Sequence, residues 1–194
     1  MNAITHVALV TGASRGIGPY IARALADAGY RLVLASRSGP ELQAQAQMLN
    51  AIGAEAVAIP ADLTDPESVE HLAAAAEKAF GRVDVLVNNA GGDPQQEFDA
   101  MTWAENETIV KLNLLAPIQL TRQLIPGMLS RGVGHVVNIS SNSCCGSPPA
   151  LFTSTSTRPN AFSAAAASCS TLSGSVRSAG IATTSAPLAR SMCA

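Results

Sequence analysis

Short apolar runs alternate with longer stretches of helical periodicity along most of this chain. Five of the runs have the length of ordinary strands and cover residues 6–11, 31–35, 56–60, 83–87 and 135–139. Between them, apolar residues recur at helical spacing, which predicts helices over about residues 16–28, 41–51, 65–80 and 102–130. Because the strands are apolar on both faces, they indicate a parallel sheet that is covered by helices on both sides.

The start of the third predicted helix carries clear local signals. Asp65 suits the N-cap, Pro66 suits the first helical position, and Glu67 places an acid in the first turn. Val69 and Leu72 then begin an apolar stripe at helical spacing. With 194 residues, the chain has room for one domain with a substantial core. We therefore predict a single α/β domain over residues 1–194, a doubly wound Rossmann sheet that is mostly parallel.

The composition and charge narrow the expected partners. Hydrophobic residues make up 47% of the chain and aromatic residues 4%, so aliphatic side chains must build the core. The net charge is −2 without a run of Lys or Arg, so neither nucleic acid nor a membrane surface is expected as a partner. No stretch approaches the ~20 apolar residues of a membrane span, and the first residues do not read as a signal peptide.

The four cysteines argue against a metal site. Cys144, Cys145, Cys169 and Cys193 have neither CxxC spacing nor a paired histidine cluster, so no metal is expected. Adjacent cysteines are poorly placed to form a disulfide with each other. We therefore interpret them as free thiols of a cytoplasmic protein.

A glycine-rich turn joins the first predicted strand to the first predicted helix, with the sequence Thr11-Gly12-Ala13-Ser14-Arg15-Gly16-Ile17-Gly18. Gly12 allows a sharp turn, Gly16 allows the backbone to approach a pyrophosphate, and Gly18 allows close helix–strand packing. The N–H groups at the helix start then face the phosphates. The spacing differs from G-x-G-x-x-G and lacks the lysine of a phosphate loop. We expect a dinucleotide here, with a glycine turn that binds no ligand as the alternative.

The glycine turn is followed by four further motifs in a fixed order. They are Asp62 in ADLTD, Asn88-Asn89-Ala90-Gly91 after the fourth strand, Asn113 in KLNLLAP on the long helix, and VVNISS over residues 136–141. With these motifs the chain resembles the short-chain dehydrogenase/reductase family, and the resemblance covers residues 1 to about 142. It implies an oxidoreductase that transfers a hydride between a nicotinamide cofactor and a small carbonyl or alcohol substrate.

The resemblance also implies roles for individual residues. Asp62 would accept a hydrogen bond from the adenine amino group, with Leu63 beside it, and Asn89, Ala90 and Gly91 would line the adenosine ribose. A turn-forming or helix-capping role is the alternative for Asp62, and turn chemistry is the alternative for the asparagines. The residues expected to bind the cofactor are Gly12, Ser14, Arg15, Gly16, Ile17, Gly18, Ser36, Arg37, Asp62, Leu63, Asn89, Ala90 and Gly91.

The end of the second strand favours NADP over NAD. An acid at this place would bind the ribose hydroxyls of NAD, whereas this chain has Ala35-Ser36-Arg37. Arg37 can contact a 2′-phosphate through two nitrogens, Ser36 can donate to it, and Arg15 lies in the adjacent turn. If Arg37 is an ordinary solvated arginine instead, the preference stays open.

The catalytic residues implied by the resemblance are only partly present. The family uses a serine that hydrogen-bonds the substrate oxygen, a tyrosine that passes the proton, a lysine that lowers the tyrosine pKa from about 10, and an asparagine that supports a water chain. Ser141 aligns with the serine, Ser140 is the alternative, and Asn113 aligns with the asparagine. No tyrosine follows Tyr30, and no lysine follows Lys111.

At the expected place of the Tyr-x-x-x-Lys motif stand Ser154 and Arg158. A serine hydroxyl is a far poorer acid than a phenol, and arginine does not replace lysine. We therefore expect weak or no turnover from this chain. An enzyme that works with Ser154 and Arg158, and a protein that binds NADP without catalysis, are the alternatives.

Residues 143–194 form an atypical tail. From residue 151 on, more than half of the residues are Ser, Thr or Ala, and Asp, Glu, Lys and Tyr do not occur. The chain also ends earlier than family members do, so we expect a fold that is truncated at its C-terminus. A shift of reading frame near residues 143–153, or a natural member with a degenerate active site, would explain this tail. The resemblance implies dimers or tetramers through the long helix and the next one, and the altered second helix argues against them here.

Overall fold

The computed structural model describes residues 6–92, 98–142, 150–152, 156–158 and 161–163. The strands of its larger sheet are β1 (Val7–Thr11), β2 (Arg31–Ser36), β3 (Ala56–Pro60), β4 (Val85–Asn88), β5 (His135–Asn138), β8 (Ser156–Arg158) and β9 (Ala161–Ser163). A smaller sheet pairs β6 (Ser140–Asn142) with β7 (Ala150–Phe152). All five strands predicted from the sequence are present, within two residues of their expected bounds.

The larger sheet has the order β3-β2-β1-β4-β5-β8-β9, and β1 to β5 run parallel. From β1 the chain first builds outward through β2 and β3, and then continues on the other side with β4 and β5. This change of direction places a crevice outside the carboxyl ends of β1 and β4, where doubly wound sheets bind ligands. β8 pairs antiparallel with β5, and β9 pairs antiparallel with β8. The predicted doubly wound, mostly parallel sheet is confirmed.

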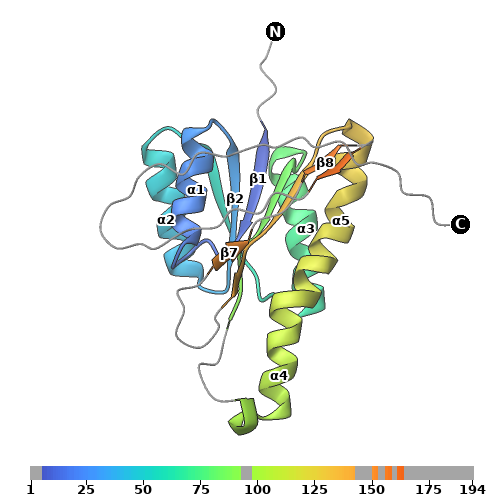
Figure 1. Cartoon of the computed structure of the whole chain (residues 1–194). Helices are drawn as coiled ribbons and strands as arrows, with labels where there is room; N and C mark the ends of the chain where they lie inside the picture. Colours follow the sequence, from blue (N-terminus) through green and yellow to red (C-terminus); the bar gives the residue numbers. More distant parts are fainter. Residues whose placement is uncertain (1–5, 93–97, 143–149, 153–155, 159–160, 164–194) are drawn as a thin grey trace, which may run out of the picture.

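Helices cover both faces of the parallel strands (Figure 1). They are α1 (Gly18–Asp27), α2 (Gly39–Ala51), α3 (Pro66–Phe80), the short η1 (Phe98–Ala100), α4 (Trp103–Val110), the π-helical turn η2 (Lys111–Leu115) and α5 (Ala116–Arg131). α1 and α2 pack on one face, where Leu42 and Val10 share a core. α3 and α5 pack on the other, where Leu72 and Leu120 share a core with Leu9. Successive residues of β1 thus point into opposite cores.

The predicted signals at the start of α3 act as expected. The Asp65 side chain caps the helix by accepting a hydrogen bond from the Glu67 N–H at 3.2 Å, and Pro66 is the first helical residue. The helix ends at Gly81, whose φ of 76° is left-handed. α4 begins with a capping box between Thr102 and Glu105, which was not expected from the sequence.

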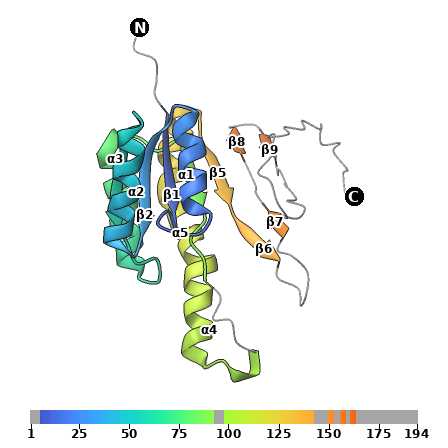
Figure 2. The same ribbon diagram turned by 90° about the vertical axis from the view of Figure 1, so that its left-hand side faces the viewer.

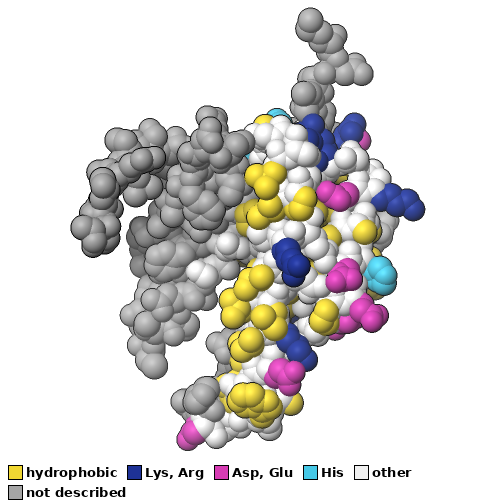
Figure 3. Space-filling model, turned by 90° about the vertical axis from the view of Figure 1, so that its right-hand side faces the viewer, with side chains coloured by type: hydrophobic (Ala, Val, Ile, Leu, Met, Phe, Trp, Pro, Cys, Tyr) yellow, Lys and Arg dark blue, Asp and Glu magenta, His cyan; other side chains and the backbone are white. Residues whose placement is uncertain are grey.

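The long helix predicted over residues 102–130 is a continuous run of α4, η2 and α5, interrupted by one π-helical turn. α4 buries none of its residues and extends beyond the rest of the sheet and helices (Figure 2). Figure 3 shows apolar side chains along the outer side of this run. The large hydrophobic residues of α4, η2 and α5 that are exposed include Trp103, Val110, Leu114, Ile118 and Leu129.

A buried carboxylate organises the amino-terminal edge of the sheet. Asp84 is only 1% exposed and accepts a hydrogen bond from the Val7 N–H at 3.0 Å. Arg82 donates to both oxygens of this carboxylate at 2.7–2.9 Å, and Arg131 and His6 approach it at 3.6 and 3.5 Å. Arg131 also donates to the Val83 carbonyl at 2.7 Å, which attaches the end of α5 to the segment just before β4. The sequence analysis did not identify this network.

Candidate functional site: a dinucleotide cleft

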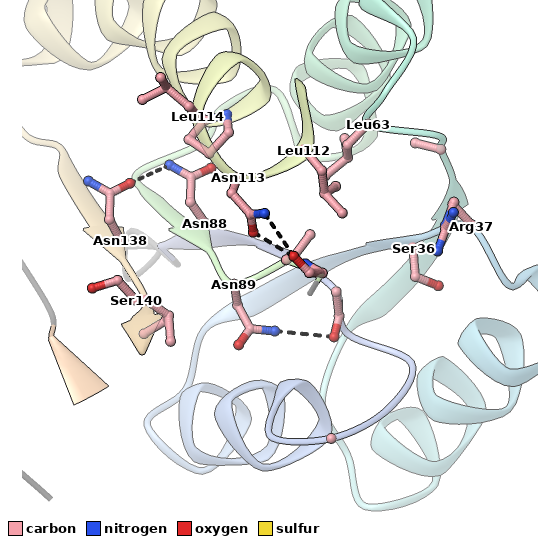
Figure 4. Close-up of a pocket in the computed structure, with 18 of the residues that line it drawn as sticks. Ser36, Arg37, Leu63, Asn88, Asn89, Leu112, Asn113, Leu114, Asn138 and Ser140 are labelled. Atoms are coloured by element: carbon pink, nitrogen blue, oxygen red, sulfur yellow. Dashed lines mark hydrogen bonds between the residues drawn. The ribbon is translucent and has the colours of Figure 1, made fainter. Parts of the chain in front are cut away.

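A cleft of about 1780 Å³ follows the carboxyl ends of the parallel strands (Figure 4). The predicted cofactor residues that line it are Gly12, Ser14, Arg15, Gly16, Ile17, Ser36, Arg37, Leu63, Asn89, Ala90 and Gly91. Gly18 and Asp62 are not part of the lining. Asn113 and Ser140 also line the cleft, whereas the side chain of Ser141 and the whole of Ser154 lie outside the described residues. The fold therefore brings most of the predicted site together.

The backbone favours glycine at each of the three positions of the turn for a different local reason. Gly12 has φ +65°, and a Cβ there would lie 2.9 Å from the Ala90 Cα, so the β1 and β4 turns approach closely. Gly16 has φ +63°, and a Cβ there would meet no atom within 4 Å, so the space above it is open. A Cβ at Gly18 would collide with the Gly12 carbonyl oxygen. Glycine at position 18 thus allows the start of α1 to lie directly against the glycine turn, in addition to the predicted helix packing.

The start of α1 presents unused backbone donors to the cleft. The N–H groups of residues 14–17 find no acceptor among the described residues. The first turn of α1 contains no acid, and Pro19 has no N–H to offer, so the free donors are those in the glycine turn before it. Unpaired N–H groups and the positive end of the helix dipole favour an anion at this position. The geometry therefore fits a phosphate group.

Thr11 and Asn89 hold the glycine turn against the β4 turn. The Thr11 hydroxyl oxygen accepts hydrogen bonds from the N–H groups of Asn89 and Ala90, both at 3.0 Å, and donates to the Val87 carbonyl at 3.3 Å. The Asn89 amide donates to the carbonyl oxygens of Thr11 and Gly12 at 3.0 and 3.2 Å. Asn89 thus has a structural role here, and the ribose contact stays a prediction. No structural role was expected for Thr11 from the sequence, although it is the first residue of the glycine motif.

Two arginines lie at the β2 end of the cleft. Arg15 and Arg37 are exposed, and neither forms an ion pair within the described part of the chain. Ser36 is buried, and its hydroxyl donates to the Ser38 carbonyl at 3.3 Å, so it must rotate before it can donate to a ligand. Glu41, in the first turn of α2, lines the same end of the cleft.

Asp62 forms a tight turn after β3. Its Oδ1 accepts hydrogen bonds from the Thr64 N–H at 2.9 Å and the Thr64 hydroxyl at 2.8 Å. The backbone hydrogen bond from Thr64 has the largest effect and lowers the pKa of Asp62. Burial comes next and raises this pKa, and the Thr64 hydroxyl and the charge of Arg37 lower it further, so that the pKa lies below its ordinary value. The turn-forming interpretation of Asp62 therefore describes its contacts in this structure. The adenine contact stays a prediction, and the buried Leu63 beside it faces the cleft.

Asn113 connects the long helix to the β4 turn. Its Oδ1 accepts from the Gly92 N–H at 3.2 Å, and its amide donates to the carbonyl oxygens of Gly92 and Ile109 at 2.9 and 3.1 Å. It lies in the π-helical turn η2, a distortion that is frequent at functional sites. A Cβ at Gly91 would lie 2.8 Å from the Asn113 Oδ1, so the approach requires a glycine.

Asn88 and Asn138, at the ends of β4 and β5, belong to two of the quoted motifs, but no contact between them was expected from the sequence. Asn88 is buried, and its amide donates to the Asn138 Oδ1 at 2.8 Å. The two residues are register partners, and the Ile139 N–H donates to the Asn88 carbonyl at 2.9 Å. This pairing holds the strand end that precedes Ser140. A signal was available, because one asparagine directly follows the predicted strand 83–87 and the other is the last residue but one of the predicted strand 135–139.

Within the described residues, no group of three His, Cys, Asp or Glu side chains could hold a metal ion. None of the described helices is long and apolar enough to cross a membrane.

Residues 6–156 match the family model of the short chain dehydrogenases. This match covers more than half of the chain, and it spans the glycine turn, the β4 turn and the end of β5 that together form the cleft. The chain belongs to the short-chain dehydrogenase family.

Particular relatives agree with this assignment. The ketoacyl reductase HetN of Nostoc sp. is 44% identical over 133 residues, which are 69% of this chain and 46% of that protein. A metagenomic short-chain oxidoreductase solved with NADP is 42% identical, with a TM-score of 0.68 over 71% of this chain and 63% of that one. The actinorhodin polyketide ketoreductase solved with NADPH is 37% identical, with a TM-score of 0.67 over 71% of this chain and 53% of that one. The chain spans about half the length of the curated relatives it matches.

Proposed function

We propose that this chain binds NADP in the cleft, as part of an oxidoreductase that transfers a hydride between the nicotinamide and a small carbonyl or alcohol substrate. One observation carries the proposal. The unpaired N–H groups of residues 14–17 and the unpaired guanidinium groups of Arg15 and Arg37 line one cleft. Groups of this kind bind phosphates. The solved relatives that contain NADP or NADPH support the choice of ligand.

The residues of the cleft suggest how the cofactor lies. The N–H groups at the start of α1 would hold the pyrophosphate, and Arg15 and Arg37 would hold the 2′-phosphate. Leu63 would cover the adenine, and the β4 turn at Asn89 and Ala90 would line the adenosine ribose. The opposite half of the dinucleotide would then extend past β4 toward the end of β5. The distance from β2 to β5 is roughly 14 Å, because these two strands are three strand spacings apart.

We assign the substrate side of this cleft to the end of β5. When bound, the dinucleotide supplies or accepts the hydride. Ser141 would donate a hydrogen bond to the substrate oxygen, and Ser140, which lines the cleft, is its alternative. Asn113 would act as a positioning residue, because its side chain is engaged with Gly92 and fixes the π-helical turn against β4.

A second candidate function is NADP binding without catalysis. Its specific support is that no tyrosine follows Tyr30 and no lysine follows Lys111, so a phenol and an ammonium group are missing after β5. We infer that this chain turns over weakly or not at all, and that residues 1–142 carry the family function while residues 143–194 do not. Translation of the other two frames of the coding DNA after codon 142 tests whether a frame shift produced this tail.

Binding and turnover assays on the full chain separate the two functions. NADPH binding is followed by its fluorescence, and NADPH consumption is measured with a panel of ketones. Binding without turnover supports the second function, and turnover that is lost in Ser141→Ala supports the first. A folded chain without affinity for NADPH or NADH would exclude both.

An arginine substitution tests the 2′-phosphate contact. Arg37→Ala should weaken NADPH binding by about tenfold and leave NADH binding unchanged, because only NADPH carries the extra phosphate. The matched control is Arg23→Ala, which removes an exposed arginine of α1 that pairs with Asp27 and does not line the cleft. Equal losses for the two cofactors would contradict the assignment.

A further inference from the structure

Glu41 is an unexplained charge at the phosphate end of the cleft. It is exposed in the first turn of α2 and lines the cleft together with Ser36, Arg37 and Ser38. Within the described residues it forms neither an ion pair nor a side-chain hydrogen bond. An acid in the first turn ordinarily stabilises a helix through its dipole, and Glu67 of α3 occupies such a position away from the cleft. Glu41 differs because it shares its surroundings with a cationic binding site.

The formal charges of the ionisable side chains around this end of the cleft cancel. Arg15 and Arg37 contribute two positive charges, and Glu41 and Asp62 contribute two negative ones. The positive charge of Arg37 acts on Asp62, since it contributes to the lowered pKa of that carboxyl. A 2′-phosphate that enters this space meets the attraction of the arginines and the repulsion of Glu41. A ribose 2′-hydroxyl is neutral and can donate a hydrogen bond to a carboxylate.

We propose that Glu41 is a specificity-determining residue that weakens the preference of the cleft for NADP over NAD. Arg37 favours the phosphorylated ribose, and Glu41 opposes it while it tolerates the free hydroxyl. The chain then accepts both dinucleotides, with only a moderate preference for NADP. This inference rests on the proposed function, because it concerns the same ligand in the same cleft.

The test compares dissociation constants for NADPH and NADH in the full-length chain and in Glu41→Gln. The substitution keeps the size of the side chain and removes its charge. The ratio of the NADH to the NADPH dissociation constant should rise by roughly three- to tenfold at low salt, and the rise should shrink at high salt. NADPH affinity should account for most of the change. The matched control is Glu67→Gln, which removes a first-turn acid from α3 outside the cleft.

The possible results distinguish a failure of the proposed role of Glu41 from a failure of the proposed function. A wild-type chain that binds neither dinucleotide overturns the proposed function. A wild-type chain that binds NADPH, with a ratio that is unchanged or lower in Glu41→Gln, overturns only the role of Glu41. Equal rises in Glu41→Gln and Glu67→Gln overturn it too, because the effect would then come from net charge. Circular dichroism of both variants establishes that they are folded.

Discussion

The pairing of polar groups differs between the two ends of the parallel strands, which form the amino-terminal and the carboxyl-terminal edge of the sheet. At the amino-terminal edge, the carboxylate of Asp84 is 1% exposed and engages Val7, Arg82, Arg131 and His6. At the carboxyl-terminal edge, the N–H groups of residues 14–17 have no acceptor within the described part of the chain. Buried polar groups are normally paired, so the first edge is arranged for stability. The unpaired donors of the second edge are arranged for a ligand.

The topology of the sheet explains why the unpaired donors lie at the carboxyl-terminal edge. All five parallel strands have their carboxyl ends at the same edge, and the order in which strands are added to the sheet reverses between β1 and β4. The turns after these strands cannot pair with each other completely, because they diverge on either side of the reversal. At the amino-terminal edge no turns diverge in this way. There the carboxylate of Asp84 can accept hydrogen bonds from the donors around it. Substitutions at the two edges should therefore have different consequences.

The largest expected effect is on stability. Asp84→Ala should lower the free energy of unfolding by about 3 kcal/mol, because it leaves the half-buried Arg82 and Arg131 without their partner. Urea denaturation measures this loss. The control is Asp27→Ala, which removes an exposed i,i+4 partner of Arg23 and should cost about 0.5 kcal/mol or less. NADPH affinity of the folded fraction should not change, and a large loss of affinity would contradict the separation of the two edges.

The next effect is on binding. Gly18→Ala places a Cβ against the Gly12 carbonyl, so the glycine turn must shift, at a cost of about 2 kcal/mol. Because the shift displaces the donors of residues 14–17, NADPH affinity should fall by more than tenfold in a fluorescence titration. The control is Gly39→Ala at the start of α2, where a Cβ would lie 3.7 Å from the Pro60 side chain, an ordinary contact. Equal behaviour of the two variants would argue against the close approach at Gly18.

Acid should weaken the amino-terminal edge through Asp84. Burial raises the pKa of Asp84, but the hydrogen bonds from Arg82 and Val7 and the charges of Arg82 and Arg131 outweigh it and lower that pKa below 3.8. The folded state therefore binds a proton less readily than the unfolded state. Its stabilisation is complete well above pH 3.8 and declines as the pH falls through the lower folded pKa.

Urea denaturation between pH 7 and pH 3 measures this dependence. Part of it should be missing in Asp84→Asn, which cannot ionise, while the part that comes from Asp62 persists. A pH profile of Asp84→Asn that parallels the wild type would show that Asp84 does not contribute.

The smallest effect is expected where the long helix meets the β4 turn. Asn113→Ala removes three hydrogen bonds from an exposed side chain, so we expect a loss of about 1 kcal/mol in the free energy of unfolding. The matched control is Asn106→Ala in α4, whose amide donates, among the described residues, only to the Thr102 carbonyl. NADPH affinity should fall a few-fold in Asn113→Ala alone, because Gly91 and Gly92 line the cleft. No difference between the two variants would remove Asn113 from the site.

The helix and strand order could be predicted from local patterns. The five strands are short apolar runs, and α3 begins where Asp65 and Pro66 place it. These features depend on neighbours within a few residues, so the chain alone specifies them. The π-helical turn η2 could not be predicted in this way, because the Asn113 side chain bonds to Gly92, which lies 21 residues away in the sequence.

The glycine turn was also legible in the sequence, and the structure places most of its predicted neighbours around one cleft. The position of Glu41 in that cleft was not foreseen, since it depends on how α2 begins beside the end of β2. Asp84 was overlooked for a related reason. Its partners Val7 and Arg131 are distant in the sequence and converge only when β1, β4 and the end of α5 meet.

The sequence by itself therefore determined the order of elements, the parallel sheet and the turn that faces the phosphates, because these follow from periodicity and from the special geometry of glycine and proline. The tertiary structure alone decided which polar groups are paired and which stay free. Hydrogen bonds and charges act over a few ångströms in space, and distance along the chain does not reveal that proximity.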